Sequence, residues 1–378
     1  MKKTYKALLC GAAAVAAVGI AYAMDERFFE KAKDKLTVFK CRANSKIMEQ
    51  ALPLTDAMFP GPKVVSGADS AKKIPEVLKE LNVNKVMIVT GPTVGRTIVP
   101  PIAENLERHG IGYTIYDQVE ANPSVKTVEA IRAQYLENGC DGFLAIGGGS
   151  PMDAAKAAAA RVAKPNTPIG KMAGLMKVMI KVAPIVAVPT TSGTGSEVTM
   201  GAVISDHDER HKYAIMDPNL VPKYAVLDPK LTVSMPKFVT ATTGIDALTH
   251  AVESYVTWAY NNNASNRNAE EAVVKIFRNL KRAYEDGNDL EAREAMLIAS
   301  YKAGLAFNHT GVGYVHAIAH AMGGIYNTAH GLANAVIMPT NALTHSQNTA
   351  PGPPSVSAVA TPAMLPVPTV EARAVDTA

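Results

Sequence analysis

Residues 142–163 read GFLAIGGGSPMDAAKAAAARVA, an apolar run followed by three glycines and an alanine-rich segment. A short apolar run that ends at a turn is typical of a strand buried on both faces, and the alanine-rich segment favours a helix. Between them, glycines let the backbone approach a phosphate, Ser150 can cap a helix and Pro151 fits its first turn. A helix N-terminus offers free N–H groups to an anion, so this stretch predicts a strand–loop–helix unit for a pyrophosphate.

A second loop of similar character follows the strand predicted at 185–188. It reads Pro189-Thr190-Thr191-Ser192-Gly193-Thr194-Gly195-Ser196-Glu197. Neither loop has the GxGxxG spacing of the common dinucleotide fingerprint, and most glycine-rich turns are only turns. Both loops nevertheless follow strands, and open parallel sheets bind ligands at the carboxyl ends of their strands. Together the two loops favour a dinucleotide site.

Strands and helices alternate from residue 62 to about residue 235, which predicts a parallel sheet covered on both faces. The other expected elements are helices at 70–81, up to 108 and at 124–138, strands at 85–90, 113–116 and 142–146, and two short strands within 217–235. This pattern predicts an α/β, Rossmann-like dinucleotide-binding domain over residues 61–235.

Acidic and histidine residues at helical spacing mark the next part of the chain. Asp246 and His250 lie four residues apart, as do His316 and His320, and such pairs share a helix face. An isolated pair of this kind is usually a capped or solvated pair. Several pairs together, in a segment with few Lys or Glu, favour a metal site. One carboxylate with several imidazoles suits Fe(II) or Zn(II) and suits Ca(II) or Mg(II) poorly.

At these residues the chain resembles the iron-containing (group III) alcohol dehydrogenases, from about residue 62 to residue 339. The resemblance rests on both loops, on ATTGIDALTHAVES at 241–254 and on GVGYVHAIAHAMGGIYNTAHGLANAVIMP at 311–339. It implies that a catalytic Fe(II) or Zn(II) is held by Asp246, His250, His316 and His330. It also implies that His320 lies beside the metal and the nicotinamide without being a ligand. A histidine that titrates near neutrality there suits a proton relay, although His320 could also merely pack or hydrogen-bond.

The resemblance further implies a site for NAD or NADP, formed by Gly91, Asn122, Gly148, Gly149, Ser150, Asp153, Thr190, Thr191, Thr194, Thr199 and Lys212. From sequence alone, Lys212 is equally well read as a solvated surface lysine. NAD-preferring relatives commonly place Asp after the strand at 85–90, where this chain has Gly91. An acidic group there would hold the ribose 2′-OH and repel a 2′-phosphate, so its absence predicts use of NADP or of both cofactors.

The activity implied by the resemblance is metal-dependent hydride transfer between NAD(P) and a small primary alcohol or diol, giving the aldehyde. Two other classes stay open. One is an inactive remnant that binds nucleotide or metal without turnover. The other is a lyase related to dehydroquinate synthase, which uses nicotinamide only transiently, although the ALTHAVE and HGLANAV contexts favour the dehydrogenase. Family members are commonly dimers or larger, so a homo-oligomer is expected.

Composition narrows the class of protein. With 378 residues, 48% hydrophobic and 19% charged, the chain is long enough for two packed domains. The net charge of +4 is spread without a basic block, so small molecules are expected as partners and nucleic acid is not. Three isolated cysteines without a CxxC exclude a cysteine zinc site and disfavour a disulfide framework.

The first sixty residues form an apolar segment and a charged linker. MKKTYK followed by ALLCGAAAVAAVGIAYA at 7–23 has the charged start, apolar run and small-residue end of a secretory signal. A membrane anchor is an alternative, although a span needs ~20 apolar residues, and so is an amphipathic or buried helix. A nicotinamide cofactor and Fe(II) favour the cytoplasm. The expected location is therefore cytoplasmic, with membrane attachment through 7–23 and secretion left open.

An all-α metal-binding domain is expected over residues 236–342, with scaffold helices at 266–285 and 290–308. His309 is read as a polar helix-end residue. The family continues through further helices after residue 339, whereas residues 343–378 are rich in Pro, Ala, Val, Thr and Ser without a period. This composition predicts a disordered tail and a truncated helical domain, from a frameshift or early end near Thr340. Helices that the missing part would cover are then expected to be exposed.

Overall fold

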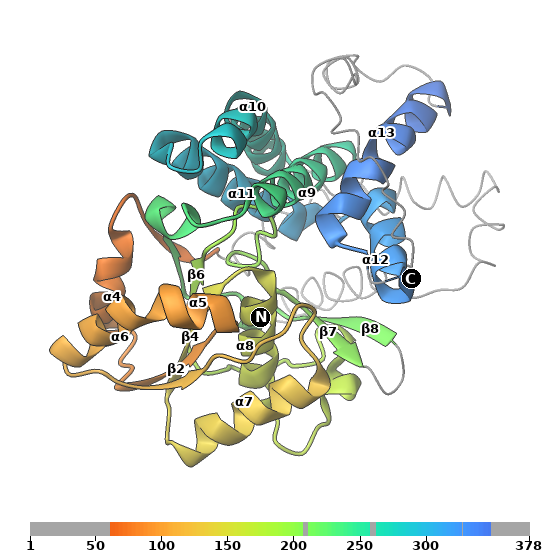
Figure 1. Cartoon of the computed structure of the whole chain (residues 1–378). Coiled ribbons are helices and arrows are strands. Elements are labelled where there is room, and N and C mark those ends of the chain that lie inside the picture. The colour runs from red at the N-terminus through yellow and green to blue at the C-terminus, as the bar shows by residue number, and fades with distance from the viewer. Residues whose placement is uncertain (1–60, 207–210, 258–261, 327, 349–378) are drawn as a thin grey trace, which may run out of the picture.

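The computed structural model describes residues 61–206, 211–257, 262–326 and 328–348. Figure 1 shows a sheet with its covering helices in one half of the molecule and a group of helices, α9 to α13, in the other. The expected order of an α/β part followed by an all-α part is confirmed. The apolar segment at 7–23 lies outside the described residues, and within the described ranges no helix is long and apolar enough to cross a membrane.

Six parallel strands form the main sheet, in the order β1-β9-β6-β4-β2-β3. All residues of β4 and β6 are buried, as expected for central strands covered on both faces. The strands are β1 (Lys63–Ser66), β2 (Lys85–Val89), β3 (Gly112–Tyr116), β4 (Gly142–Gly147), β6 (Ile185–Pro189) and β9 (Tyr224–Leu227).

Successive residues of each strand enter different cores, because strand side chains alternate between faces. Met87 and Val89 of β2 join a core with α7 and α8, whereas Val86 and Ile88 join a core with α4 and α6. Fully burying each of these apolar side chains stabilises the fold by roughly 1.5–3 kcal/mol. The helices of the α/β part are η1 (Ser70–Lys73), α4 (Ile74–Glu80), α5 (Pro92–Thr97), α6 (Val99–Arg108), α7 (Val125–Glu137), α8 (Gly149–Ala163) and η2 (Ile169–Met172).

The segment from Asp217 to Met235 differs from the prediction of two strands. It holds one strand, β9, between the 3-10 turns η3 (Pro218–Leu220) and η4 (Pro229–Thr232). Each turn has a proline in its first positions, where a missing N–H costs nothing. A small second sheet, which the sequence did not predict, has the order β5-β8-β7 and consists of β5 (Gly174–Leu175), β7 (Gly201–Asp206) and β8 (His211–Met216).

Five helices form the second half: α9 (Lys237–Val256), α10 (Asn263–Glu285), α11 (Leu290–Thr310), α12 (Tyr314–Tyr326) and α13 (His330–Asn348). The two scaffold helices and the helix-end position of His309 are where the sequence predicts them. α13 continues to Asn348, beyond residue 342, where the helical domain is expected to end. The rest of the expected tail, 349–378, lies outside the described residues. Exposed apolar side chains on α12 and α13 include Ile318 at 47% and Val336 at 64%.

The two halves are packed against each other through α11. Leu297 of α11 is buried in a cluster with Ala225 and Leu227 of β9. Further along the helix, Gly304 meets the second glycine-rich loop so closely that a Cβ on Gly195 would lie 2.8 Å from the Gly304 Cα. The dinucleotide loops therefore rest directly on the helical half.

Candidate metal and dinucleotide site

The two glycine-rich loops leave the sheet side by side. β4 and β6 are parallel neighbours, and their last paired residues are Gly147 and Pro189. Gly147 has φ of +150°, and a Cβ there would lie 2.7 Å from Cγ of Pro151. Glycine is needed at this position to turn the chain from β4 into α8. Both predicted loops thus lie at the carboxyl edge of the sheet, where such sheets bind ligands.

Close contacts hold the second loop against the start of α8. A Cβ on Gly148 would come within 3.2 Å of Thr191 Oγ1, and one on Gly149 within 3.0 Å of Thr194 Cγ2. Gly148 is the N-cap of α8 and provides no side-chain cap. The first N–H groups of α8 therefore lie beside a loop of small polar residues, which is the arrangement that favours a bound pyrophosphate.

The prediction that Ser150 caps the helix is wrong. Ser150 is already within α8, and its Oγ accepts a hydrogen bond of 3.2 Å from the backbone N–H of Asn122. Asn122 has a left-handed backbone with φ of 59°, which Asn tolerates in turns. Its side-chain Oδ1 accepts a hydrogen bond of 3.1 Å from Nζ of Lys212. Three predicted cofactor residues are therefore connected in one chain of contacts.

Lys212 lies between the two predicted sites. It is partly buried, and this burial lowers the pKa of its ammonium group. A Cβ on Gly323 of α12 would lie 3.6 Å from its Nζ. These neighbours favour a role in the site over the alternative of a solvated surface lysine. The structure places it between the Asn122 turn and a helix of the metal cluster.

Asp153 and Thr199, two of the predicted cofactor residues, make hydrogen bonds to the second loop and to the backbone that continues from it. The Asp153 carboxylate accepts hydrogen bonds from Ser196 Oγ at 2.8 Å and from the Val203 N–H at 3.0 Å. The Thr199 carbonyl accepts a hydrogen bond of 2.8 Å from Nζ of Lys156. Both residues therefore stabilise the second loop and the backbone that follows it through hydrogen bonds.

Lys156 is a residue that sequence reasoning missed. Its side chain is fully buried, and its Nζ also donates to the Ser196 carbonyl at 2.6 Å and to the Gly201 carbonyl at 2.9 Å. Burial lowers the pKa of Lys156 to about 8, although Asp153 and Glu197 act in the opposite direction. The ammonium group fixes the backbone that continues from the second loop into β7.

The remaining predicted cofactor residues lie at the same edge of the sheet. Gly91 follows β2, the neighbour of β4, and is the N-cap of α5. Thr190 is buried, and its N–H donates to the Gly147 carbonyl at 2.8 Å. Gly91 and Thr190 thus lie with the two glycine-rich loops at the carboxyl ends of neighbouring strands.

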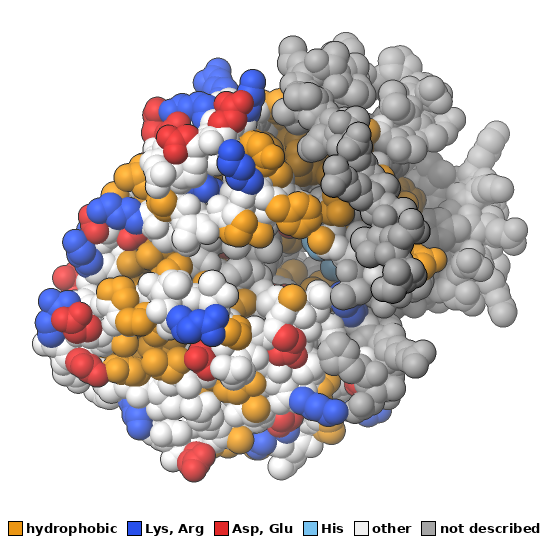
Figure 2. All heavy atoms as spheres, viewed as in Figure 1, with side chains coloured by type: hydrophobic (Ala, Val, Ile, Leu, Met, Phe, Trp, Pro, Cys, Tyr) orange, Lys and Arg blue, Asp and Glu red, His pale blue; other side chains and the backbone are white. Residues whose placement is uncertain are grey.

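The four predicted metal ligands converge from three helices. α9 supplies Asp246 and His250, α12 supplies His316 and α13 begins with His330. Potential ligand atoms of the first three lie within 4.8 Å of one another. Asp246 Oδ1 lies 3.5 Å from His316 Nε2 and 3.4 Å from His330 Nε2. Figure 2 shows pale blue histidine atoms at the bottom of a hollow between the two halves.

Contacts behind the rings orient two of these histidines. The Nδ1 of His250 lies 3.3 Å from the Gly193 carbonyl of the second loop, and the ring is stacked between His316 and Phe307. The Nδ1 of His316 lies 2.5 Å from Oε2 of Glu253. In both cases an acceptor at Nδ1 favours the tautomer that leaves Nε2 free to bind an ion.

Glu253 and Asn334 were not identified from sequence. The Asn334 Nδ2 donates to Asp246 Oδ1 at 2.7 Å and lies 3.4 Å from the Nε2 atoms of both His316 and His330. The spacing along the sequence could have identified both residues. Glu253 follows Asp246 by two helical turns, and Asn334 follows His330 by four residues. Both residues therefore share a helix face with a predicted ligand.

The charge states of the cluster suit a divalent cation. Burial opposes the charge on Asp246, but the surrounding histidines outweigh it and lower the pKa of the carboxyl. Burial lowers the pKa of His250 to about 3. Burial also opposes a proton on His316, yet hydrogen bonds to Asp246 and Glu253 outweigh it and raise the pKa of His316 to about 9. At neutral pH the metal-free cluster thus holds an anionic Asp246, a neutral His250 and a protonated, positively charged His316.

These residues fit a borderline divalent ion. A tetrahedral ion with bonds of about 2.1 Å sets its ligand atoms roughly 3.4 Å apart, close to the Asp246–His316 and Asp246–His330 separations of 3.5 and 3.4 Å. Three imidazoles and one carboxylate are also the donor set expected for Fe(II) or Zn(II). An ion in this position would displace the additional proton of His316.

His320 lies next to this cluster without joining its hydrogen bonds to Asp246. Its ring centroid is 4.8 Å from that of His330 and 6.4 Å from that of His316. Partial desolvation of the ring lowers the pKa of His320, and repulsion from His330 and His316 lowers it further. The side chain still reaches solvent. His320 thus lies beside the expected ligands, and its lowered pKa departs from the near-neutral titration expected from the sequence.

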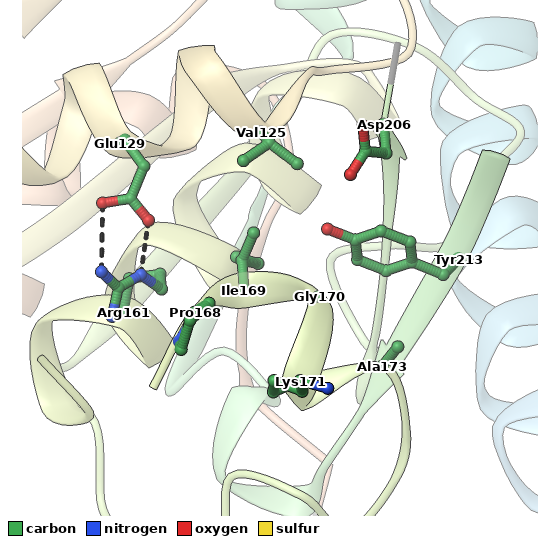
Figure 3. A pocket seen from close by; sticks show the side chains of 10 residues that line it. All are labelled: Val125, Glu129, Arg161, Pro168, Ile169, Gly170, Lys171, Ala173, Asp206 and Tyr213. Carbon is green, nitrogen blue, oxygen red and sulfur yellow. Dashed lines mark hydrogen bonds and ion pairs between the residues drawn. The ribbon is translucent and has the colours of Figure 1, made fainter. Parts of the chain in front are cut away.

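A separate cavity of about 590 Å³ is lined by residues of α7, α8, η2 and the small sheet. Figure 3 shows that Tyr213 and Asp206 border it from the small sheet, while Glu129 and Arg161 form an ion pair at its rim. It is lined by none of the predicted ligands or cofactor residues. The metal cluster brings several ligand atoms together, so the hollow between the two halves is the better candidate for the active site.

Comparison with known proteins agrees with this geometry. The family model described as "iron-containing alcohol dehydrogenase" matches residues 61–229, and the model of the C-terminal part of the same family matches residues 240–358. The second match extends past residue 339, where the resemblance to the family in the sequence analysis ends.

Individual relatives give the same result. Alcohol dehydrogenase 4 of Saccharomyces cerevisiae strain YJM789 is 37% identical over 72% of this chain and 71% of its own length. The NAD-dependent methanol dehydrogenase of Bacillus methanolicus is 37% identical over 76% of this chain and 74% of its own. The crystal structure of a 1,3-propanediol oxidoreductase superposes with a TM-score of 0.73, at 36% identity over 76% of this chain and 75% of that one. The chain, with its parallel sheet, paired loops and Asp–His cluster, belongs to the iron-containing alcohol dehydrogenase family.

Proposed function

We propose that the chain is a metal-dependent NAD(P) alcohol dehydrogenase that interconverts a small primary alcohol or diol with its aldehyde. The observation that carries this proposal is the contact of His250 with the second loop, where Nδ1 lies 3.3 Å from the Gly193 carbonyl. The loop expected to bind the dinucleotide therefore also orients an expected metal ligand. Lys212 makes a second connection between the Asn122 turn and α12. Hydride transfer needs this proximity, because the cofactor and the substrate must meet in one site.

In this proposal Asp246, His250, His316 and His330 would hold the ion, which would act as a Lewis acid toward the alcohol or aldehyde oxygen. Glycine-rich loops and the start of α8 bind the cofactor pyrophosphate. His320 is neutral at physiological pH because its pKa is lowered, and its side chain reaches solvent. Its imidazole can therefore accept the proton that leaves the alcohol hydroxyl and release it to water.

Isotope transfer tests the proposal directly. The purified chain is incubated anaerobically with Fe(II) or Zn(II), NADP⁺ or NAD⁺ and 1,1-dideuterated butanol. We expect butanal and one deuterium on the nicotinamide ring for each turnover. Cofactor and metal binding without deuterium transfer would identify the inactive remnant. A lyase related to dehydroquinate synthase would show no net reduced cofactor, because it reoxidises the nicotinamide within each turnover.

Cofactor selectivity is expected to depend on Gly91. Gly91→Asp should lower the preference for NADPH over NADH by about tenfold or more, since a carboxylate beside the 2′-phosphate repels it by ~1.4 kcal/mol or more. A Cβ at this position would lie 3.2 Å from the Val119 carbonyl, so Gly91→Ala serves as the control for crowding. kcat/KM for both cofactors is measured for each variant. A strong preference of the unmodified chain for NADH would contradict the prediction.

Metal binding is expected to weaken as the pH falls. The pKa of His316 is raised to about 9 by its two carboxylate partners, so an ion must displace this proton at any lower pH. The apparent Kd for Zn(II) should therefore rise about tenfold for each pH unit from about 9 down to about 7. Competition with a chelator of known Zn(II) affinity at each pH measures it. A Kd that does not change over this range would show that His316 is not a ligand or holds no proton.

Assembly and location follow the family and the chemistry. We expect a homo-oligomer, with a small alcohol or aldehyde as the substrate, and a cytoplasmic location where reduced iron and nicotinamide cofactors are maintained. Attachment to a membrane through 7–23 remains part of this expectation as an alternative.

A further inference from the structure

We propose that Glu253 is a positioning residue: it fixes the His316 ring as a metal ligand and holds the start of α12 against α9. The inference rests on the proposed function in so far as His316 binds an ion.

Both carboxylate oxygens of Glu253 accept hydrogen bonds. Oε2 accepts hydrogen bonds from His316 Nδ1 at 2.5 Å and from the Gly313 N–H at 2.8 Å, while Oε1 accepts from the Val315 N–H at 2.7 Å. The side chain is only 5% exposed. A buried carboxylate with three donors is rigidly held, because each donor would otherwise be left unsatisfied.

Two of the donors belong to the N-terminus of α12, which begins at Tyr314. The first N–H groups of a helix lack partners within the helix, and a negative charge is favourable there. Glu253 therefore caps α12 from a different helix. Gly313 permits this approach, since a Cβ there would lie 2.7 Å from Oε1 of Glu253.

The third donor connects the cap to the metal cluster. An acceptor at Nδ1 of His316 requires the hydrogen on that nitrogen and leaves Nε2 facing Asp246 Oδ1, 3.5 Å away. Asp246 and Glu253 are two turns apart on α9 and contact His316 through opposite ring nitrogens. Although His316 belongs to α12, its orientation is therefore set by α9.

The decisive variant is Glu253→Gln, which keeps the length of the side chain but removes one of the two strong acceptors. We expect its Kd for Zn(II), measured by chelator competition on the full chain, to rise by about 10- to 100-fold. The Kd for NADPH should change by less than about twofold, because the dinucleotide loops do not contact Glu253. Glu294→Gln, at an exposed position of α11, is the matched control and should change neither constant.

A purely structural cap predicts a different pattern. If Glu253→Gln lowers the melting temperature of the metal-free chain and leaves the Kd for Zn(II) unchanged, the proposal is overturned. Failure of the unmodified chain to bind Zn(II) would overturn it as well. If Glu253→Gln does not fold, Gly313→Ala pushes the carboxylate away without changing its charge, and a Zn(II) affinity equal to that of the unmodified chain would count against the proposal.

The tautomer gives a second readout that does not depend on turnover. In the Zn(II)-loaded chain labelled with ¹⁵N-histidine, His316 should carry its hydrogen on Nδ1, and Glu253→Gln should weaken or reverse this preference. Failure of the proposed function is distinguishable, because it would appear as absent deuterium transfer with an unchanged Zn(II) affinity. A hydrogen on Nε2 of His316 in the unmodified chain would contradict the inference.

Discussion

Asp246→Ala is expected to abolish tight metal binding and to lower aldehyde reduction by on the order of a thousandfold or more. Asp246 is buried at the centre of the cluster, with His316, His330 and Asn334 all within 3.5 Å of its Oδ1. It is the only carboxylate among the four proposed ligands. A bound ion that acts as a Lewis acid contributes several kcal/mol to catalysis, which corresponds to a loss of this size.

Metal content and turnover are measured together for this variant, and NADPH binding serves as the control for folding of the α/β half. The Kd for NADPH should stay within about twofold of the unmodified chain, because the dinucleotide loops lie on the sheet edge. Asp246→Ala with full metal content and full turnover would show that the ion is held elsewhere.

Gly331→Ala is expected to have the largest effect on the helical half. A Cβ on Gly331 would lie 2.1 Å from the carbonyl oxygen of Thr242 and 2.6 Å from its carbonyl carbon. Both atoms belong to the backbone of α9, so a side-chain rotation cannot relieve the overlap. Overpacking typically costs ~1–3 kcal/mol and more where the backbone must move. α13 should therefore shift away from α9 and take the neighbouring ligand His330 with it.

Thermal unfolding of the metal-free chain and the Kd for Zn(II) measure the two consequences. We expect a lower melting temperature and a Zn(II) affinity reduced by at least about tenfold. Gly323→Ala is the matched control, since its Cβ would meet no atom closer than 3.5 Å. Alanine in the interior of α12 should stabilise the helix slightly, by ~0.5–1 kcal/mol. If Gly331→Ala were as stable and bound Zn(II) as tightly as this control, the close packing of α13 on α9 would be wrong.

Much of the fold could be predicted because burial on both faces leaves a clear pattern. Strands such as 85–90 and 142–146 are continuous apolar runs that end at glycine, and they appear as β2 and β4. The hairpin of β7 and β8 was missed because GAVISDHDERHKYAIMD carries mostly polar residues and only brief alternation. The sequence signal for such a partly exposed pair is weaker than for a buried strand.

The candidate site could be predicted where the spacing of residues along a helix shows that their side chains lie close together. Residues four apart on a helix, such as Asp246 and His250, necessarily share a face, and the structure places them in one cluster. Contacts between distant segments leave no such signal. Glu253 meets His316 across 63 positions, and Lys156 meets Thr199 across 43. Neither pairing follows from local pattern, and a lysine in an alanine-rich helix reads as a solvated residue.

Local rules also failed where tertiary contacts override them. Ser150 has the residue type of a helix cap, but the turn at Gly147 places it inside α8, where it binds Asn122 instead. His320 has the residue type of a neutral-pH acid or base, but two neighbouring histidines and displaced water lower its pKa. In both cases at least one partner from another element sets the chemistry of the residue: Asn122 for Ser150, and His330 for His320.

The most direct test of the account is anaerobic oxidation of NADPH and NADH by the purified chain with butanal, before and after adding Fe(II) or Zn(II). The account predicts turnover that requires the metal, is lost in Asp246→Ala, and is at least as fast with NADPH as with NADH. Folded chain that binds both metal and NADPH and yet oxidises neither cofactor would contradict the proposal that the Asp–His cluster and the glycine-rich loops form one catalytic site.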